Sequence, residues 1–246
     1  LNFINSGEKI ETNKFMCKTL KEVNEGCAMI TEWVYQKCID QLNKGKKVGL
    51  LGGDHSIAFG FIKALAEKHE NFGILQIDAH CDLRKSYEGL DHSHGSIMYN
   101  VLNSFPNVTK LIQLGIRDYC EAEWNYICDS EYRVITYLER GIRERQFEGA
   151  TWAQLSDEII NQLPQNVYIS YDIDGLDPKL CPHTGTPVPG GFEMEQLSYL
   201  FKKILTSGRK IIGFDLSETG TSKNGWDENV GARVLFKMCN LMLSDN

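Results

Sequence analysis

The chain has 246 residues and a formal net charge of −7, with 33 acidic and 26 basic side chains. This length suits one large α/β domain and is sufficient to bury a sizeable core. Hydrophobic residues make up 42% of the chain and charged residues 24%, which argues against a disordered or fibrous protein. The net acidity and the lack of a Lys/Arg block argue against nucleic acid or a membrane as a partner.

The beginning of the chain and its cysteines indicate its cellular setting. It begins Leu1-Asn2-Phe3, without a methionine or an apolar signal segment, so we expect the numbering to start inside a longer protein. Eight cysteines are scattered along it without a Cys-x-x-Cys pair. This pattern favours reduced, mostly buried thiols and a cytoplasmic location.

Predicted strands and helices alternate along the chain. Apolar residues at roughly helical spacing predict a first helix over 15–44. Strands are predicted over 46–51, 72–77, 109–115, 133–135, 166–171 and 210–215. Further helices are predicted through Phe61 and Ala66, over 152–163, over 194–206, and from about 228 to 243. This alternation predicts a parallel sheet with helices on both faces, and no linker or repeat divides the chain.

Carboxylate and imidazole side chains follow four of the predicted strands. In a parallel sheet, the carboxyl ends of the strands form one edge, where polar function gathers. We therefore expect these side chains to meet at one rim: His55 after the first strand, Asp78, His80 and Asp82 after the second, Asp172 and Asp174 after the fifth, and Asp215 and Glu218 after the sixth.

The spacing of these residues predicts a site for two metals. Asp78, His80 and Asp82 lie at i, i+2 and i+4, so on an extended segment all three point to the same side. Four carboxylates at a buried rim repel one another unless cations neutralise them. Asp and His ligands suit Mn²⁺, with Ni²⁺, Co²⁺ and Zn²⁺ as alternatives. A water or hydroxide between two such metals is a strong nucleophile at neutral pH.

Simpler interpretations exist for each segment. Asp-x-His-x-Asp on its own is also typical of a loop with capping aspartates, and Asp54 and Ser56 suit the start of a helix. Asp172-x-Asp174-Gly would suit a calcium loop, but Leu176 and His183 occupy the positions where an EF-hand needs acidic ligands. Cys81 lies between the ligands and is interpreted as a packing residue.

Three motifs resemble those of a known family. Gly-Gly-Asp-His-Ser (52–56), Asp-Ala-His-Cys-Asp (78–82) and Ser-Tyr-Asp-Ile-Asp-Gly-Leu-Asp-Pro (170–178) are similar to the signatures of the ureohydrolases, which include arginases and agmatinases. The resemblance implies a single domain over 1–246, folded as a three-layer α/β/α sandwich and assembled as trimers or hexamers. It implies one Mn²⁺ held by His55, Asp78, Asp82 and Asp172, and another held by Asp78, His80, Asp172 and Asp174.

The resemblance also assigns catalytic and substrate-binding roles. His94, in a segment similar to the agmatinase pattern Asp-Leu-Arg-x-x-Tyr-Glu-Gly-x-x-x-Ser-His, matches the proton-transferring histidine, with His92 as its rival. Glu218 matches the glutamate that binds the substrate guanidinium. Thr186 matches a loop residue that contributes a hydroxyl near the metals. A surface histidine, a strand-end cap and a turn residue are the respective alternatives.

Three features bear on the choice of substrate, on what precedes the first motif and on the wall of the expected pocket. Arg84 occupies the place of an arginase asparagine, and the acidic 83–93 loop suits a cationic amine better than a carboxylate, which favours agmatine over arginine. Relatives usually carry a longer segment before Gly-Gly-Asp-His, so we expect an N-terminal strand and loop to be missing. Ser217-Glu218-Thr219-Gly220 also departs from the family's Val-Glu-Val/Asn-Pro.

The sequence therefore predicts a binuclear manganese amidinohydrolase of polyamine biosynthesis. A metal-bridging hydroxide would attack the guanidinium carbon of agmatine and release urea and putrescine. Alternatives within the family are arginase, guanidinobutyrase and formimidoylglutamase activities. An alternative from another class is a non-catalytic metal-binding homologue.

Overall fold

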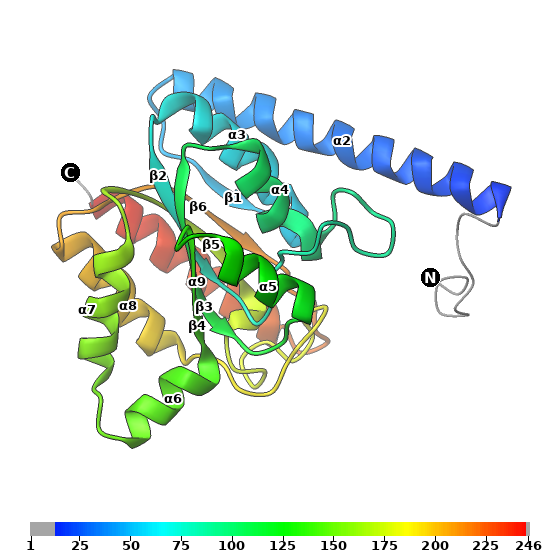
Figure 1. Cartoon of the computed structure of the whole chain (residues 1–246). Helices are drawn as coiled ribbons and strands as arrows, with labels where there is room; N and C mark the ends of the chain where they lie inside the picture. The colour runs from blue at the N-terminus through cyan, green and yellow to red at the C-terminus, as the bar shows by residue number, and fades with distance from the viewer. Residues whose placement is uncertain (1–12, 245–246) are drawn as a thin grey trace.

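A six-stranded parallel sheet forms the centre of the computed structural model, which describes residues 13–244 (Figure 1). The strand order is β1-β6-β5-β2-β3-β4, and each neighbouring pair is parallel. The strands are β1 (Gly49–Leu51), β2 (Phe72–Ile77), β3 (Val108–Ile116), β4 (Val134–Leu138), β5 (Asn166–Asp172) and β6 (Lys210–Ser217). All six predicted strands are thus present, although β1 begins three residues later than expected.

Helices cover both faces of this sheet, as predicted (Figure 1). One layer contains α2 (Lys14–Asn43), α3 (Ala58–Lys68), α4 (Ile97–Ser104) and α5 (Glu121–Asp129). The opposite layer contains α6 (Glu139–Phe147), α7 (Trp152–Gln162), α8 (Met194–Thr206) and α9 (Trp226–Ser244). The arrangement is the predicted three-layer α/β/α sandwich.

Two hydrophobic cores, one on each face of the sheet, hold the layers together. Side chains of a strand alternate between faces: Ile74 joins the core beneath α2–α5, whereas Leu75 and Ile77 join the core beneath α6–α9. Every residue of β2 is buried, as expected for a central strand covered on both faces. These cores fix the strand ends at which the polar rim is built.

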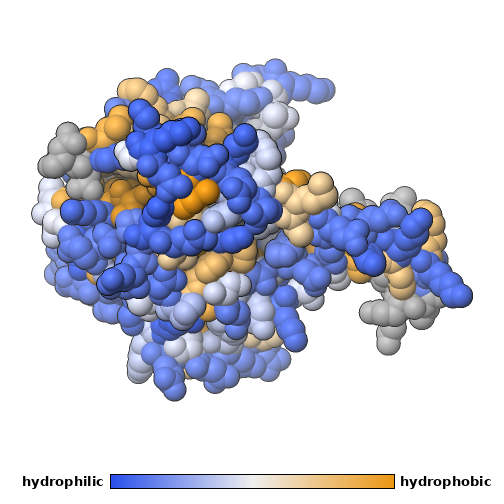
Figure 2. Space-filling model, turned by 90° about the horizontal axis from the view of Figure 1, so that it is seen from above, coloured by the Kyte–Doolittle hydropathy of each residue, from blue (hydrophilic) through white to orange (hydrophobic). Residues whose placement is uncertain are grey.

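Helix α2 extends beyond the body of the protein. Asn13 caps its first turn by accepting hydrogen bonds from the backbone N–H groups of Phe15 and Met16. Its C-terminal part packs on α3 through Val34 and Cys38, whereas its N-terminal half forms an arm beside the body (Figure 2). Several apolar side chains of α2 are exposed: Phe15, Val23, Met29, Ile30 and Trp33.

Three short helices were absent from the sequence-based expectation: α4, α5 and α6. The predicted final helix is present as α9 and begins two residues earlier, at Trp226.

Within residues 13–244, no helix combines the length and apolar character that crossing a bilayer requires. The same part of the chain contains all eight cysteines and no disulfide bond.

Candidate metal centre and substrate pocket

The carboxyl ends of three strands bring the predicted ligands together. His55 follows β1 in the short 3₁₀ helix η2 (His55–Ile57), which Asp54 caps by accepting a 2.9 Å hydrogen bond from the Ser56 backbone N–H. Asp78 follows β2 directly, and Asp172 ends β5. Since β1 and β2 flank the β6–β5 pair in the sheet, residues distant in sequence meet at one rim.

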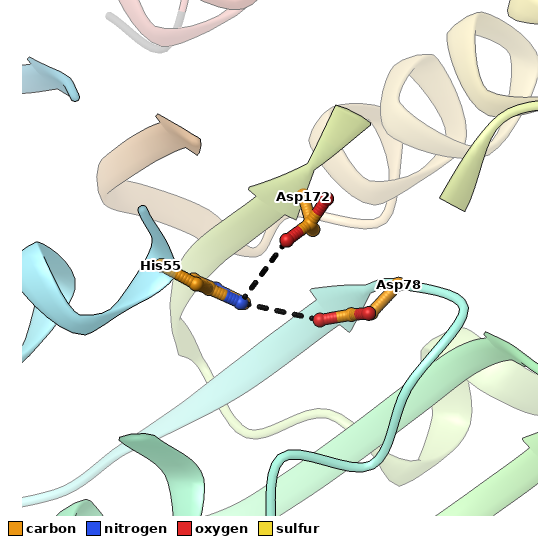
Figure 3. A group of neighbouring side chains, drawn as sticks. All are labelled: His55, Asp78 and Asp172. Atoms are coloured by element: carbon orange, nitrogen blue, oxygen red, sulfur yellow. Dashed lines mark ion pairs between the residues drawn. The ribbon is translucent and has the colours of Figure 1, made fainter. Parts of the chain in front are cut away.

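One group of side chains surrounds the imidazole of His55. Its Nδ1 lies 2.9 Å from Asp82 Oδ2, 3.2 Å from Asp78 Oδ2 and 3.5 Å from Asp172 Oδ2. Figure 3 shows Asp78 and Asp172 converging on the ring from different strands. All four side chains are buried, so the group forms a compact set of nitrogen and oxygen donors of the kind that holds a divalent cation.

A second group shares Asp78 with the first. His80 Nδ1 lies 3.0 Å from Asp174 Oδ2 and 3.5 Å from Asp78 Oδ1. The two oxygens of Asp78 therefore face different groups: Oδ2 faces His55 and Oδ1 faces His80. A carboxylate in this position suits a bridge between two metals, and the six predicted ligands all lie in these two groups.

Burial and mutual repulsion dominate the electrostatics of the centre. Burial and the Asp78 carboxylate raise the pKa of Asp82 to about 7. Burial and the carboxylates of Asp174 and Asp78 raise the pKa of Asp172 well above its usual range. Burial disfavours protonation of His80, yet hydrogen bonds to Asp174 and Asp78 outweigh this effect and raise its pKa to about 11. The site therefore concentrates negative charge where water cannot screen it.

Hydrogen bonds hold the ligands in position. His55 Nε2 lies 2.7 Å from Ser170 Oγ, so Nδ1 is left facing the carboxylates. The side-chain amide of Gln76 donates to Asp78 Oδ2 at 2.8 Å. The Ala79 backbone N–H donates to Asp174 Oδ1 at 3.0 Å. These contacts leave the remaining lone pairs of the set directed into the rim.

A cavity of about 200 Å³ opens beside the two groups. Its wall includes the ligands His80 and Asp82, together with the predicted residues His94 and Thr186. The other lining residues are Arg84, Tyr87, Gly95, Asp118, Glu123, Pro187 and Val188. His92, the rival of His94, is instead packed edge-on against Phe59, with ring centroids 5.8 Å apart.

Glu218 lies next to the first group with an unusual backbone conformation. Its φ of 60° is uncommon for a residue with a side chain, and three hydrogen bonds to two segments hold it there. Its N–H donates to Gly53 O at 2.8 Å, its Oε1 accepts from the His55 N–H at 2.9 Å, and its carbonyl accepts from Thr184 Oγ1 at 2.8 Å. Burial raises the pKa of its carboxyl, although His55 and His94 oppose the increase.

Asp118 and Glu123 line the cavity without having been predicted. They follow β3, which contributes no repeated Asp or His spacing but lies next to β2 in the sheet. The rule that polar function gathers after strand ends points to this segment, because Asp118 comes two residues after β3. The sequence prediction applied that rule to only four of the six strands.

Comparison with known proteins gives the family. A family model described as "Arginase family" matches residues 8–239. The N(1)-aminopropylagmatine ureohydrolase of Thermus thermophilus is 31% identical over 204 residues, which cover 82% of this chain and 65% of that protein. The mitochondrial agmatinase of Gallus gallus is 32% identical over 225 residues, which cover 89% of this chain and 62% of that protein. The chain thus spans somewhat less than two thirds of these relatives.

Solved structures agree in fold. The agmatine ureohydrolase of Thermoplasma volcanium superposes with a TM-score of 0.73 at 24% identity, covering 88% of this chain and 69% of that one. An arginase from Bacillus subtilis gives a TM-score of 0.71 at 26% identity, and the superposition covers 86% of this chain and 77% of that one. The similarity therefore extends over most of the sandwich.

Proposed function

Because this chain belongs to the arginase family, we propose that it is a manganese-dependent amidinohydrolase that converts agmatine to putrescine and urea. The observation that carries the proposal is the pair of ligand groups sharing Asp78. A cytoplasmic location and assembly into trimers or hexamers belong to the same proposal.

The donor set fits two divalent cations. Four buried carboxylates with two imidazoles form a site in which cations relieve the repulsion that raises the pKa values of Asp82 and Asp172. Oxygen and imidazole donors without a thiolate suit Mn²⁺, because Cys81 lies between the ligands yet joins the hydrophobic core. When bound, two such cations lower the pKa of a shared water and supply a nucleophile at neutral pH.

The remaining residues bind the substrate and move protons. The Glu218 carboxylate is proposed to pair with the planar guanidinium. Thr186 Oγ1 lies 3.4 Å from Asp174 Oδ2, so its hydroxyl faces the region where the attacked carbon would lie. Water adds to that carbon, the bond to the alkyl nitrogen breaks, and His94 delivers a proton to the departing amine.

The cavity wall supports a substrate with a cationic tail. Arg84 is the basic residue that would oppose such a tail, but its Nε lies 3.7 Å from the buried Glu123 carboxylate. The names of the two curated relatives also refer to agmatine or its aminopropyl derivative. Arginine, guanidinobutyrate and formimidoylglutamate are the competing substrates.

The test is metal analysis combined with urea release from a panel of guanidino compounds. We expect about two Mn²⁺ per chain and the highest kcat/KM for agmatine. Glu218→Gln should lower turnover strongly while the Mn²⁺ content stays the same. Two bound Mn²⁺ without hydrolysis of any compound would favour a non-catalytic metal-binding protein. Turnover of arginine but not of agmatine would overturn the choice of substrate.

A further inference from the structure

The cavity wall contains more Asp and Glu than Lys and Arg side chains. Apart from the two metal ligands and His94, the wall contains three charged side chains: Arg84, Asp118 and Glu123. Arg84 and Glu123 form an ion pair, and Glu123 also accepts hydrogen bonds from the backbone N–H groups of Leu83 and Cys120. Asp118 is therefore the wall carboxylate that remains available to a ligand.

The surroundings of Asp118 support this availability. Its side chain is 66% exposed and forms no hydrogen bond within residues 13–244. The neighbouring Arg117 does not neutralise it, because that guanidinium donates to the carbonyls of Gly115, Asp174, Leu176 and Val188. Among the described residues, the basic group within 4.0 Å of its carboxylate is His80, whose Nε2 lies 4.0 Å from Asp118 Oδ2, beyond hydrogen-bond distance.

The cavity between the metal groups and Asp118 suits an alkyl chain. Tyr87, Pro187 and Val188 contribute apolar surface to its wall. The ring of Tyr87 packs edge-on against His94, with centroids 5.4 Å apart, and lies 4.9 Å from the Arg84 guanidinium. A substrate whose guanidinium is held at Glu218 would thus extend its methylene groups along this wall.

We propose that Asp118 is a specificity-determining residue that binds the terminal ammonium of the substrate tail. This inference rests on the proposed function, since it assumes a guanidino group at the metal centre. It assigns the selection of an amine over a carboxylate to one side chain on the loop after β3.

A competing role for Asp118 is orientation of His80. A carboxylate facing the outer nitrogen of a metal-binding histidine is a common arrangement. The 4.0 Å separation and the exposure of Asp118 disfavour it. The two roles predict different results: an orienting residue affects metal binding and all substrates equally, whereas an ammonium-binding residue affects only substrates with a cationic tail.

The test compares three variants of the Mn²⁺-loaded protein with three guanidino compounds that differ in their tails. Asp118→Asn removes the charge, and Asp118→Lys reverses it. Glu121→Gln removes a charge from an exposed residue that begins α5, three residues after Asp118, and does not line the cavity. The compounds are agmatine, the uncharged butylguanidine and the anionic 4-guanidinobutyrate. Metal content is measured alongside kcat/KM.

The expected results follow from charge and exposure. Because water weakens an exposed ion pair, Asp118→Asn should lower kcat/KM for agmatine by about two- to fivefold, mainly through KM. Asp118→Lys should lower kcat/KM for agmatine by about tenfold or more and raise kcat/KM for 4-guanidinobutyrate. For butylguanidine, kcat/KM should change little in either variant. Glu121→Gln should have the wild-type kcat/KM for all three compounds.

Two outcomes would overturn the inference. An equal loss for all three compounds, or a loss of Mn²⁺, would assign Asp118 to the orientation of His80. If the wild type hydrolyses none of the compounds, the proposed function fails, and calorimetry with putrescine then decides the inference separately. In that experiment Asp118→Asn must weaken putrescine binding relative to Glu121→Gln, and equal affinities would refute the subsite.

Discussion

Asp172 has opposing effects on stability and on metal binding. It is buried beside the carboxylates of Asp174 and Asp78, and burial together with these neighbours raises its pKa. A carboxyl with a raised folded-state pKa destabilises the fold as the pH rises above the unfolded value of about 3.9. Without a cation, ionised Asp172 is therefore unfavourable at neutral pH, and a bound cation reverses this effect.

Asp172→Asn should consequently change two measurements in opposite directions. At pH 7 we expect the Tm of the EDTA-treated variant to exceed that of the EDTA-treated wild type, because one buried charge is gone. The Mn²⁺ content after reconstitution should fall and urea release should be lost. Asp129→Asn, which removes an exposed charge at the end of α5, serves as the control. A lower Tm in the metal-free Asp172→Asn protein would contradict this account.

The grouping of the six ligands follows from sequence spacing combined with a simple property of parallel sheets. The common edge of the strands brings Asp78, His55 and Asp172 together. Asp82 joins this group with a φ of 54°, so the segment after β2 is not extended throughout as the spacing argument assumed. The same rule points to Asp118, which lies two residues after β3, but its place beside His80 depends on β3 lying next to β2. Strand order is a property of the whole sheet and is not encoded in local spacing.

At the scale of elements, an ion pair connects α9 to the loop that carries Thr186. The buried Asp227, at the start of α9, accepts hydrogen bonds from the His183 backbone N–H and from His183 Nδ1, both at 2.9 Å. The His183 carbonyl in turn approaches Gly220, where a Cβ would lie only 2.0 Å from it. This pair thus holds together the two segments that position Glu218 and Thr186.

Asp227→Ala should loosen this connection while the sandwich stays folded. Loss of two hydrogen bonds to a buried carboxylate is expected to lower the free energy of unfolding by about 2 kcal/mol and to reduce kcat more than Mn²⁺ content. His183→Gly, which keeps the backbone hydrogen bond, should show a smaller effect. Equal effects of the two variants would show that the imidazole contact dominates. Denaturant unfolding, metal analysis and urea release measure these quantities.

The same pair predicts a pH dependence. Burial raises the pKa of Asp227, but hydrogen bonds from His183 outweigh burial and lower it. A lowered folded-state pKa means that the stabilisation is complete above the unfolded value of about 3.9 and is lost as the pH falls through the folded value. The stability difference between wild type and Asp227→Asn should therefore shrink as the pH falls below about 4. A difference that disappears already at pH 6 would contradict this assignment.

Helix α2 contacts the turn after the cavity residue Tyr87 through one asparagine. Asn24 Nδ2 donates to Gly89 O at 3.3 Å, and its Oδ1 accepts from the Asp91 N–H at 3.1 Å, so it holds the turn that follows Tyr87. Asn24→Ala should raise KM for agmatine by a few-fold, because these contacts are exposed and individually weak. Asn24→Asp keeps only the acceptor for the Asp91 N–H, so its KM should lie between those of the wild type and Asn24→Ala. An unchanged KM in both variants would show that the turn is stable without α2.

The elements were predictable to the extent that each one buries apolar side chains periodically. Each of the six strands is rich in apolar residues, and all six were found. Helix α6 buries only Ile142 and α5 only Glu123, so neither has an apolar stripe to detect. Helix α4 does have one, formed by Ile97, Met98, Val101 and Leu102, and the prediction overlooked it beside the catalytic motif.

For the molecule as a whole, metal binding should contribute substantially to stability. A cation that binds only the folded protein stabilises it by about 2.7 kcal/mol per site when its free concentration is 100 times its Kd. We expect Tm to rise with Mn²⁺ concentration and to fall on EDTA treatment. High salt should leave most of the effect of EDTA in place, because salt screens buried charges much less than exposed ones. A Tm independent of Mn²⁺ would contradict the metal centre.

The strand order also determines when the ligands can assemble during synthesis. In the described sheet β1 pairs with β6 alone, and β6 lies near the opposite end of the chain. His55 lies four residues after the end of β1, so it cannot be fixed against Asp78 and Asp172 until the ribosome has translated β6. Contacts between such distant segments form late in folding. Metal loading would accordingly require that the chain has been translated at least through β6.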